Sequence, residues 1–153
     1  MLNLKRVQSE NGNFGYTKPS DRAHPSLVGV GVLCTYFWKQ DKDRSVRDGI
    51  EFMLNMTDKY PVKYKSETGD LYAWYYNTQA CLMFGGSAWS KWNRMFQDEI
   101  ADNQSPDGSW PPVNSKAPGS EHQKKPDGAG PYYRTCLCIL MLEVFYRYMP
   151  ITK

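Results

Sequence analysis

The sequence predicts an all-α protein built from three helical hairpins. Amphipathic segments with apolar residues at helical spacing alternate with segments that are apolar on nearly all sides. A short turn sequence occurs twice, beginning at Gln8 and at Gln104, which are 96 residues apart. An amphipathic segment ends halfway between these copies, so the repeat length is about 48 residues, within the range of helical arrays. We therefore expect one domain with hairpin repeats over residues 1–40, 43–86 and 87–150.

The amphipathic segments are predicted to be outer helices, each with one buried stripe and one face in solvent. In the third repeat the apolar stripe comprises Trp89, Trp92, Met95, Phe96 and Ile100. In the middle repeat it comprises Val46, Ile50, Met53 and Leu54. In the first repeat, Leu2, Leu4 and Val7 read as the last turns of an outer helix whose beginning we expect to lie outside this chain.

Three other segments, at residues 26–38, 72–84 and 133–149, are apolar nearly all round. This pattern is expected of helices that neighbours cover on most sides. The three segments superpose without gaps, and outer and inner segments alternate along the chain. We therefore expect three stacked hairpins whose inner helices share one wall.

The turn at residues 104–110 (QSPDGSW) matches the QW motif, and with it the chain resembles the α/α-toroid superfamily of terpenoid cyclases and protein prenyltransferases. Residues 74–80, 85–93 and 142–150 are similar to the C-terminal part of bacterial prenyltransferase/squalene-oxidase-repeat proteins. This resemblance covers nearly the whole chain. It implies a partial α/α-toroid, about half of a squalene-cyclase-like barrel.

The resemblance also implies a structural role for the repeated turn, which ties helix ends together. The residues concerned are Gln8, Gly12 and Phe14 in the first copy and Gln104, Gly108 and Trp110 in the second. Residues 57–70 stand where the middle repeat would carry the same turn, and they depart from the motif. The repeats are therefore not equivalent.

The expected half-ring has consequences for partners. A three-hairpin array leaves one edge of each end helix uncovered, and exposed apolar faces of that size indicate an interface. We expect a homodimer, or docking of this chain on a larger one.

Composition narrows the classes of function. The formal net charge is +3 with scattered cations, so nothing favours nucleic-acid binding. Glu143 and Arg147 interrupt the longest apolar run, so no membrane span is predicted. The chain opens without a secretory signal, whereas full-length proteins of the resembled type often look exported, and its compartment stays open.

Motifs for metal or acid chemistry are not found in the sequence. Four cysteines are expected to be buried free thiols, and the two histidines, His24 and His122, do not cluster with them. No metal ion or cofactor is therefore predicted, and the zinc site of protein prenyltransferases cannot be placed. The chain has neither the Asp-x-Asp-Asp acid of cyclases nor an Asp-Asp-x-x-Asp magnesium motif. These absences count against a complete cyclase, although another half could carry the acid.

Aromatic residues at the starts of two inner helices are the candidate ligand-binding groups. If they line a concave end, their ring faces suit an isoprenoid-like lipid; otherwise they fill gaps between helices. They are Tyr72, Trp74, Tyr75, Tyr76, Tyr132 and Tyr133.

We expect a non-catalytic interaction or scaffold module. One alternative is a fragment of a squalene- or hopene-type cyclase that binds a polyprenyl lipid in an aromatic cavity. Another is a carbohydrate-active α/α-toroid. The Pro- and Gly-rich loop at residues 111–131 is expected to be a solvated excursion.

Overall fold

A computed structural model describes residues 2–19, 25–39, 42–117 and 119–147, which are mostly helical and contain no strand. The predicted all-α class is confirmed. The longer helices are α2 (Val28–Lys39), α3 (Arg44–Asn55), α4 (Leu71–Phe84), α5 (Gly86–Ala101) and α7 (Ala129–Leu142). The short elements are α1 (Leu2–Val7), η1 (Pro25–Leu27), η2 (Met56–Asp58), α6 (Glu121–Lys124) and α8 (Val144–Arg147).

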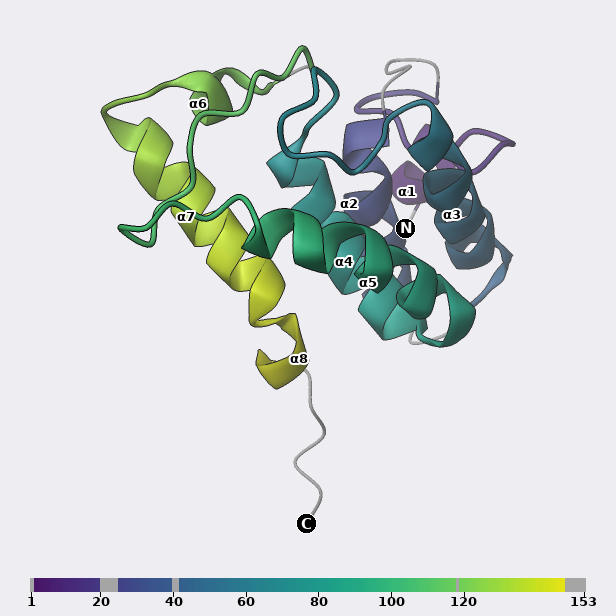
Figure 1. Cartoon of the computed structure of the whole chain (residues 1–153). Helices are drawn as coiled ribbons and strands as arrows, with labels where there is room; N and C mark the ends of the chain where they lie inside the picture. Colours follow the sequence, from purple (N-terminus) through teal and green to yellow (C-terminus); the bar gives the residue numbers. More distant parts are fainter. Residues whose placement is uncertain (1, 20–24, 40–41, 118, 148–153) are drawn as a thin grey trace.

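The helices form two layers. In Figure 1, α2, α4 and α7 run in the same direction, and α4 packs between the other two. Outer helix α3 contacts α2 and α4, and α5 contacts α4 and α7. The predicted alternation of outer and inner helices therefore matches the contacts of these five helices.

Local signals explain where the central helices begin. The carboxylates of Asp43 and Asp70 each accept a hydrogen bond from a backbone N–H three residues later, at 3.1 Å, and so cap α3 and α4. Gly85, at φ 76°, ends α4 and leads directly into α5. Both predicted outer stripes are confirmed, because Val46, Ile50 and Met53 of α3 and Trp92, Phe96 and Ile100 of α5 are buried.

Helices α2 and α4 approach each other closely because α2 carries a glycine at the contact. A Cβ atom added to Gly29 would lie 2.6 Å from the backbone nitrogen of Asn77. Any larger residue at this position would push the two helices apart. The inner row therefore depends on a small residue at this crossing.

The third inner helix differs from its predicted span of residues 133–149. Helix α7 begins earlier, at Ala129, because Gly128 turns the chain at φ 59° and Pro131 fits the first helical turn, where a backbone N–H has no intrahelical acceptor. The helix stops at Leu142, and α8 follows after one residue. Residues 148 and 149 lie outside the described residues.

The two copies of the repeated turn share one hydrogen-bond pattern. In each copy, the residue after the glutamine donates its N–H to the carbonyl of the residue before the aromatic side chain. The glycine N–H then donates to the carbonyl of the residue after the glutamine. These four bonds measure 2.8–2.9 Å, and Gly12 and Gly108 have φ angles of 91° and 85°. The repeat seen in the sequence is thus a repeat of backbone geometry.

The side chains of the two turns differ in what they hold. Phe14 and Trp110 are both buried, and the Trp110 indole donates to the Ile100 carbonyl at 2.8 Å. Gln104 closes its own turn, whereas Gln8 donates across to the carbonyl of Ser45 in α3, at 2.8 Å. The first turn therefore fastens two outer elements, and the second fastens the end of α5.

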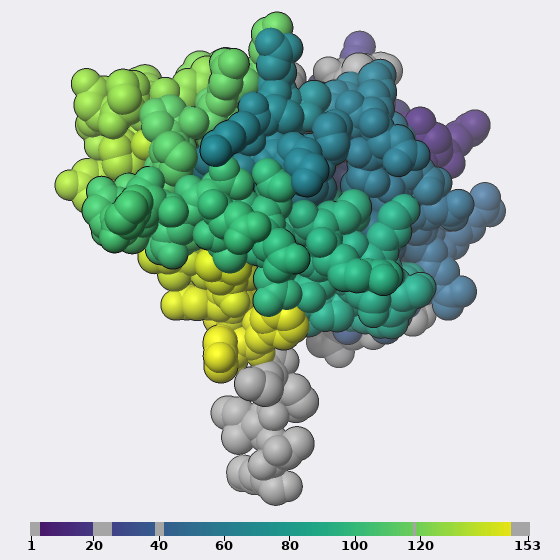
Figure 2. All heavy atoms as spheres, in the orientation of Figure 1, coloured from purple at the N-terminus to yellow at the C-terminus, as the bar shows by residue number. Residues whose placement is uncertain are grey.

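Residues 57–70, here called the middle loop, are held in place by a buried tyrosine. The Tyr64 hydroxyl donates to the Pro111 carbonyl at 2.7 Å, and its backbone N–H donates to the Glu99 carboxylate at 2.6 Å. A further bond of 2.6 Å joins the Lys116 N–H to the Glu67 carbonyl, and the two loops lie side by side in Figure 2. Tyr64 therefore links the middle loop to the long loop.

The prediction that residues 111–131 form a solvated excursion is right for Glu121, His122 and Asp127, which are exposed, and wrong for the part of the loop that packs on the domain. Val113, Ser115, Ala117, Ser120 and Gln123 are buried. The Gln123 side-chain carbonyl accepts from the Leu71 N–H at 2.8 Å, so α6 packs against the start of α4. The loop is packed because distant residues supply partners for its polar groups.

A buried arginine of α7 is the main anchor of this loop. Residue Arg134 is 2% exposed, and its guanidinium donates to the carbonyls of Trp110, Gln123 and Lys125. Burial lowers the pKa of this guanidinium. These three acceptors lie at separate points of the loop, so one side chain fixes its path.

The prediction of four buried thiols is wrong for two of them. Cys81 and Cys138 are buried, whereas Cys34 and Cys136 are exposed, and all four are free. The exposed pair lies on α2 and α7, the two ends of the inner row, and among the described residues no helix packs against the outer side of either one. No helix in the described part of the chain is long and apolar enough to cross a membrane.

Candidate functional site

Three of the six candidate aromatic residues form one cluster along α4. Tyr76 makes edge-to-face contacts with Tyr72 and with Tyr75, and both pairs of ring centres are 4.9 Å apart. All three rings are half-buried. This arrangement is typical of aromatic packing, with part of each ring left open.

Tyr133 of α7 lies near this cluster, and its neighbour Tyr132 does not. Burial, together with smaller contributions from Asp70, Tyr72 and Tyr76, raises the pKa of Tyr133 to about 12. The Tyr133 hydroxyl is therefore protonated at neutral pH. Tyr132 points into solvent, at 76% exposed.

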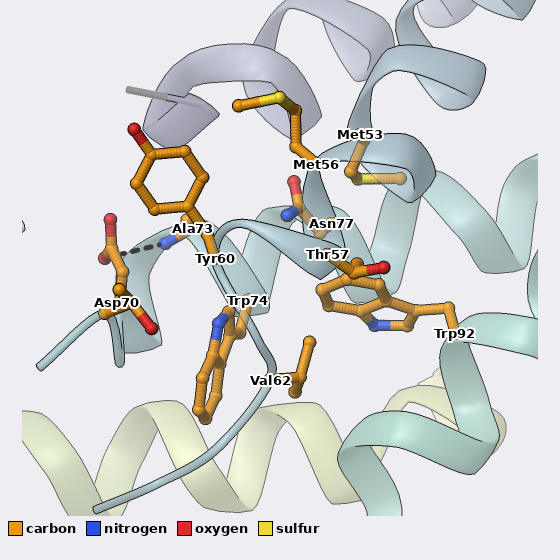
Figure 3. Close-up of a pocket in the computed structure, with 11 residues that line it drawn as sticks. Met53, Met56, Thr57, Tyr60, Val62, Asp70, Ala73, Trp74, Asn77 and Trp92 are labelled. Atoms are coloured by element: carbon orange, nitrogen blue, oxygen red, sulfur yellow. Dashed lines mark hydrogen bonds between the residues drawn. The ribbon is translucent and has the colours of Figure 1, made fainter. Parts of the chain in front are cut away.

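Trp74 takes a different direction from the α4 tyrosines. It is buried and lines a small cavity between α3, α4, α5 and the middle loop, shown in Figure 3. The remaining lining residues are Met53, Met56, Thr57, Tyr60, Val62, Thr68, Asp70, Ala73, Asn77 and Trp92. The six candidates thus fall into a cluster of three tyrosines with Tyr133 nearby, one solvent-exposed tyrosine and one cavity-lining tryptophan.

Two of the polar side chains that line this cavity belong to α4 and its N-cap, and the sequence analysis missed both. Asp70 and Asn77 are seven residues apart, which places them on one side of α4 (Figure 3). One Asp70 carboxylate oxygen caps the helix and lies 3.4 Å from the Gln123 side-chain nitrogen. Asn77 is 6% exposed, and its side-chain oxygen accepts no hydrogen bond within the described residues. Their helical spacing in an otherwise apolar segment was the available signal.

The cavity suits water better than a lipid. It has about 30 Å³ of room for the centres of water molecules. A buried water needs roughly 10–15 Å³ by this measure, so about two waters fit, and one of them can donate to Asn77. An isoprenoid chain does not fit this cavity.

Titratable groups do not form a reactive centre in the described part of the chain. No group of three or more His, Cys, Asp and Glu residues there could hold a metal ion. Burial raises the pKa of the Cys81 and Cys138 thiols, so both are protonated and poor nucleophiles at neutral pH. His122 is exposed, with its ring centre 5.8 Å from that of Tyr133, and His24 lies outside the described residues.

The large exposed apolar side chains gather on the end helices of the inner row. Phe37 and Trp38 of α2 are 56% and 65% exposed, and Ile139 of α7 is 41% exposed. On α7, Tyr132, Cys136 and Ile139 follow one another at helical spacing and are exposed, opposite the buried Arg134, Cys138 and Met141. In α8, Phe145 and Tyr146 are 36% and 78% exposed, and the Phe145 ring also packs against Trp89 of α5, with ring centres 5.1 Å apart.

Comparison of this chain with protein-family models, with curated proteins and with solved structures finds no match. The proposals below therefore rest on the residues of this chain and on their arrangement.

Proposed function

We propose that this chain is a non-catalytic interaction module that completes an α/α ring by association. The uncovered apolar sides of α2 and α7 carry this proposal. In the proposed assembly, α7 of one copy packs against α2 of a second copy, and the same contact recurs on the other side. Two copies then supply six inner helices, which is the arrangement of a complete toroid.

The positions of the exposed residues support an association through the row ends. The middle helix α4 is covered by neighbours on both sides, and its tyrosines are half-buried. The end helices instead present Trp38 and Ile139 to solvent. Burying such side chains against a partner stabilises an assembly by about 1.5–3 kcal/mol each. Contacts between two different surfaces close into a ring when the rotation between copies permits it.

The charges of these surfaces agree with the same arrangement. Among the described side chains of α2, Cys34, Phe37 and Trp38 are exposed and Val30 is half-buried, and none of these four is charged. An uncharged apolar side can be buried without the desolvation that charged groups would require.

Native mass spectrometry and light scattering of the purified chain test the proposal. We expect the mass of two chains and dissociation of the Trp38→Glu/Ile139→Glu variant into monomers, because each substitution places a carboxylate in the interface. Tyr16→Glu is the control, since Tyr16 is 73% exposed and lies outside α2 and α7 in the sequence.

Two outcomes would overturn the proposal. If the wild-type chain stays monomeric at high concentration, the proposed self-association is refuted. Co-purification of an apolar molecule of isoprenoid size, lost on substitution of Tyr72 and Tyr76, would favour the lipid-binding alternative.

A further inference from the structure

An open groove runs between the outer helices α3 and α5, on the opposite layer from the α2 and α7 surfaces. It provides about 530 Å³ for the centres of water molecules. Its floor is apolar and consists of Ile50, Leu54, Phe84 and Ala88. The short Ala88 side chain leaves the hollow between the two helices. Both helices lie on the face seen in Figure 2.

The rim of this groove is cationic. Arg47 of α3 and Lys91 and Arg94 of α5 line it, against one carboxylate, Glu51. All four side chains are exposed. Within the described residues, none of the three cations forms an ion pair.

The two arginines are partly positioned by their own helices. The Arg47 Nε atom donates to the Lys42 carbonyl at 2.8 Å, and the Arg94 Nε atom donates to the Ser90 carbonyl at 3.1 Å. Among the described residues, the terminal nitrogens of the two guanidinium groups have no acceptor and can therefore bind one from a partner. A carboxylate is the acceptor that matches guanidinium geometry.

An apolar floor with a cationic rim suits a ligand that is both apolar and anionic, either a lipid or an amphipathic helix. The shape of the groove distinguishes between these two. A lipid tail needs cover on most of its surface, as ligand pockets bury about 70–90% of a ligand. This groove is open to solvent along its length, so it would leave such a tail exposed. An amphipathic helix needs cover only on one stripe, and it can place apolar side chains at i, i+3, i+4 and i+7 in a groove between two helices.

We infer that the α3–α5 groove binds an acidic amphipathic helix of a protein partner. The apolar stripe of that helix lies on Leu54, Phe84 and Ala88, and its flanking carboxylates pair with Arg47, Lys91 and Arg94. This inference goes beyond the proposed ring assembly, because it uses the outer helices and leaves α2 and α7 free.

A pair of synthetic peptides tests the inference. Each peptide has about 15 residues, leucines at i, i+3, i+4 and i+7, and either glutamates or lysines on the flanks. Binding is followed by backbone amide chemical shifts of the ¹⁵N-labelled protein. We expect the glutamate peptide to bind, the lysine peptide to bind at least about tenfold more weakly, and the shifts to concentrate on α3 and α5.

Charge reversal supplies the matched variants. In the Arg47→Glu/Lys91→Glu/Arg94→Glu protein, we expect about a tenfold loss of affinity for the glutamate peptide and a gain for the lysine peptide. The control reverses Lys65, Lys124 and Lys125, which are also exposed and lie outside the groove. It changes the net charge by the same amount, and its affinity should stay within about twofold of wild type.

Three results would overturn the inference: equal binding of both peptides, shifts centred on α2 and α7, or an equal loss of affinity in the control. The Trp38→Glu/Ile139→Glu variant separates this inference from the ring proposal. Peptide binding must persist in that variant whether or not the wild-type chain forms dimers.

Discussion

Replacing Arg134 by methionine should loosen the long loop and destabilise the whole domain. The guanidinium donates to the Trp110 carbonyl at 2.9 Å, to the Gln123 carbonyl at 3.3 Å and to the Lys125 carbonyl. Methionine retains much of the apolar stem but donates no hydrogen bond. Three carbonyls then lose a charged donor at the point where the loop meets α7.

The expected loss follows from two opposing contributions. Hydrogen bonds to a charged group contribute about 1.5–3 kcal/mol each, which gives roughly 5–9 kcal/mol for three. Removing the buried charge also removes its desolvation penalty, which offsets this loss by several kcal/mol. We therefore expect a net loss of about 3 kcal/mol in the free energy of unfolding, and a fall of about 6–12 °C in Tm.

Chemical denaturation and hydrogen exchange measure this effect. The denaturation midpoint of Arg134→Met should fall, and the Val113 amide, which donates to the Gln123 carbonyl at 3.0 Å, should exchange faster. The control is Arg94→Met, because that side chain is also on a helix but is exposed. If Arg134→Met unfolds within about 0.5 kcal/mol of wild type, the anchoring role of this arginine is refuted.

Three further predictions concern the turns, the tyrosine cluster and the core. Gly108→Ala should lower the free energy of unfolding by about 1–2 kcal/mol, because Gly108 has a positive φ. Gly12→Ala should lower it by at least about 1 kcal/mol more, because the new Cβ would also lie 2.2 Å from a backbone carbonyl oxygen. The denaturation midpoints of the two variants measure this difference. The raised pKa of Tyr133, about 12, favours the neutral form in the folded state, so its stabilisation is complete below about pH 10 and is lost as the pH rises through about 12. Denaturation at several alkaline pH values should show a smaller loss for Tyr133→Phe than for wild type, and equal losses would contradict this. Trp92→Phe removes the indole hydrogen bond to the Thr78 hydroxyl, 2.8 Å long, and a double-mutant cycle with Thr78→Val should give a coupling of about 1 kcal/mol; additive effects would show that this bond contributes nothing.

The sequence was sufficient for elements whose signal is local. The stripe of Trp92, Phe96 and Ile100 identifies α5, because burial of a helix face requires apolar residues at this spacing. The two turns were recognisable because their glycines are required by positive φ angles at both copies.

The sequence was misleading where the deciding partner is distant along the chain. The long loop looked solvated because its prolines and polar residues lack a local pattern, whereas Arg134 and the start of α4 provide its hydrogen bonds. The candidate aromatic residues could not be assigned to one site for a related reason. Trp74 and Tyr75 are adjacent in sequence, but a helix turns them about 100° apart, so one lines the cavity and the other joins the tyrosine cluster.

By itself, the sequence determined the helical class, the alternation of outer and inner helices and the repeated turn, because these follow from the period of apolar residues and from backbone sterics. Only the tertiary structure decided which sides of α2 and α7 stay uncovered, why Cys34 is exposed while Cys81 is buried, and where the cationic groove lies. The sequence of an inner helix that is apolar all round does not show which of its sides is exposed. That side is identified only from which helices pack together in three dimensions.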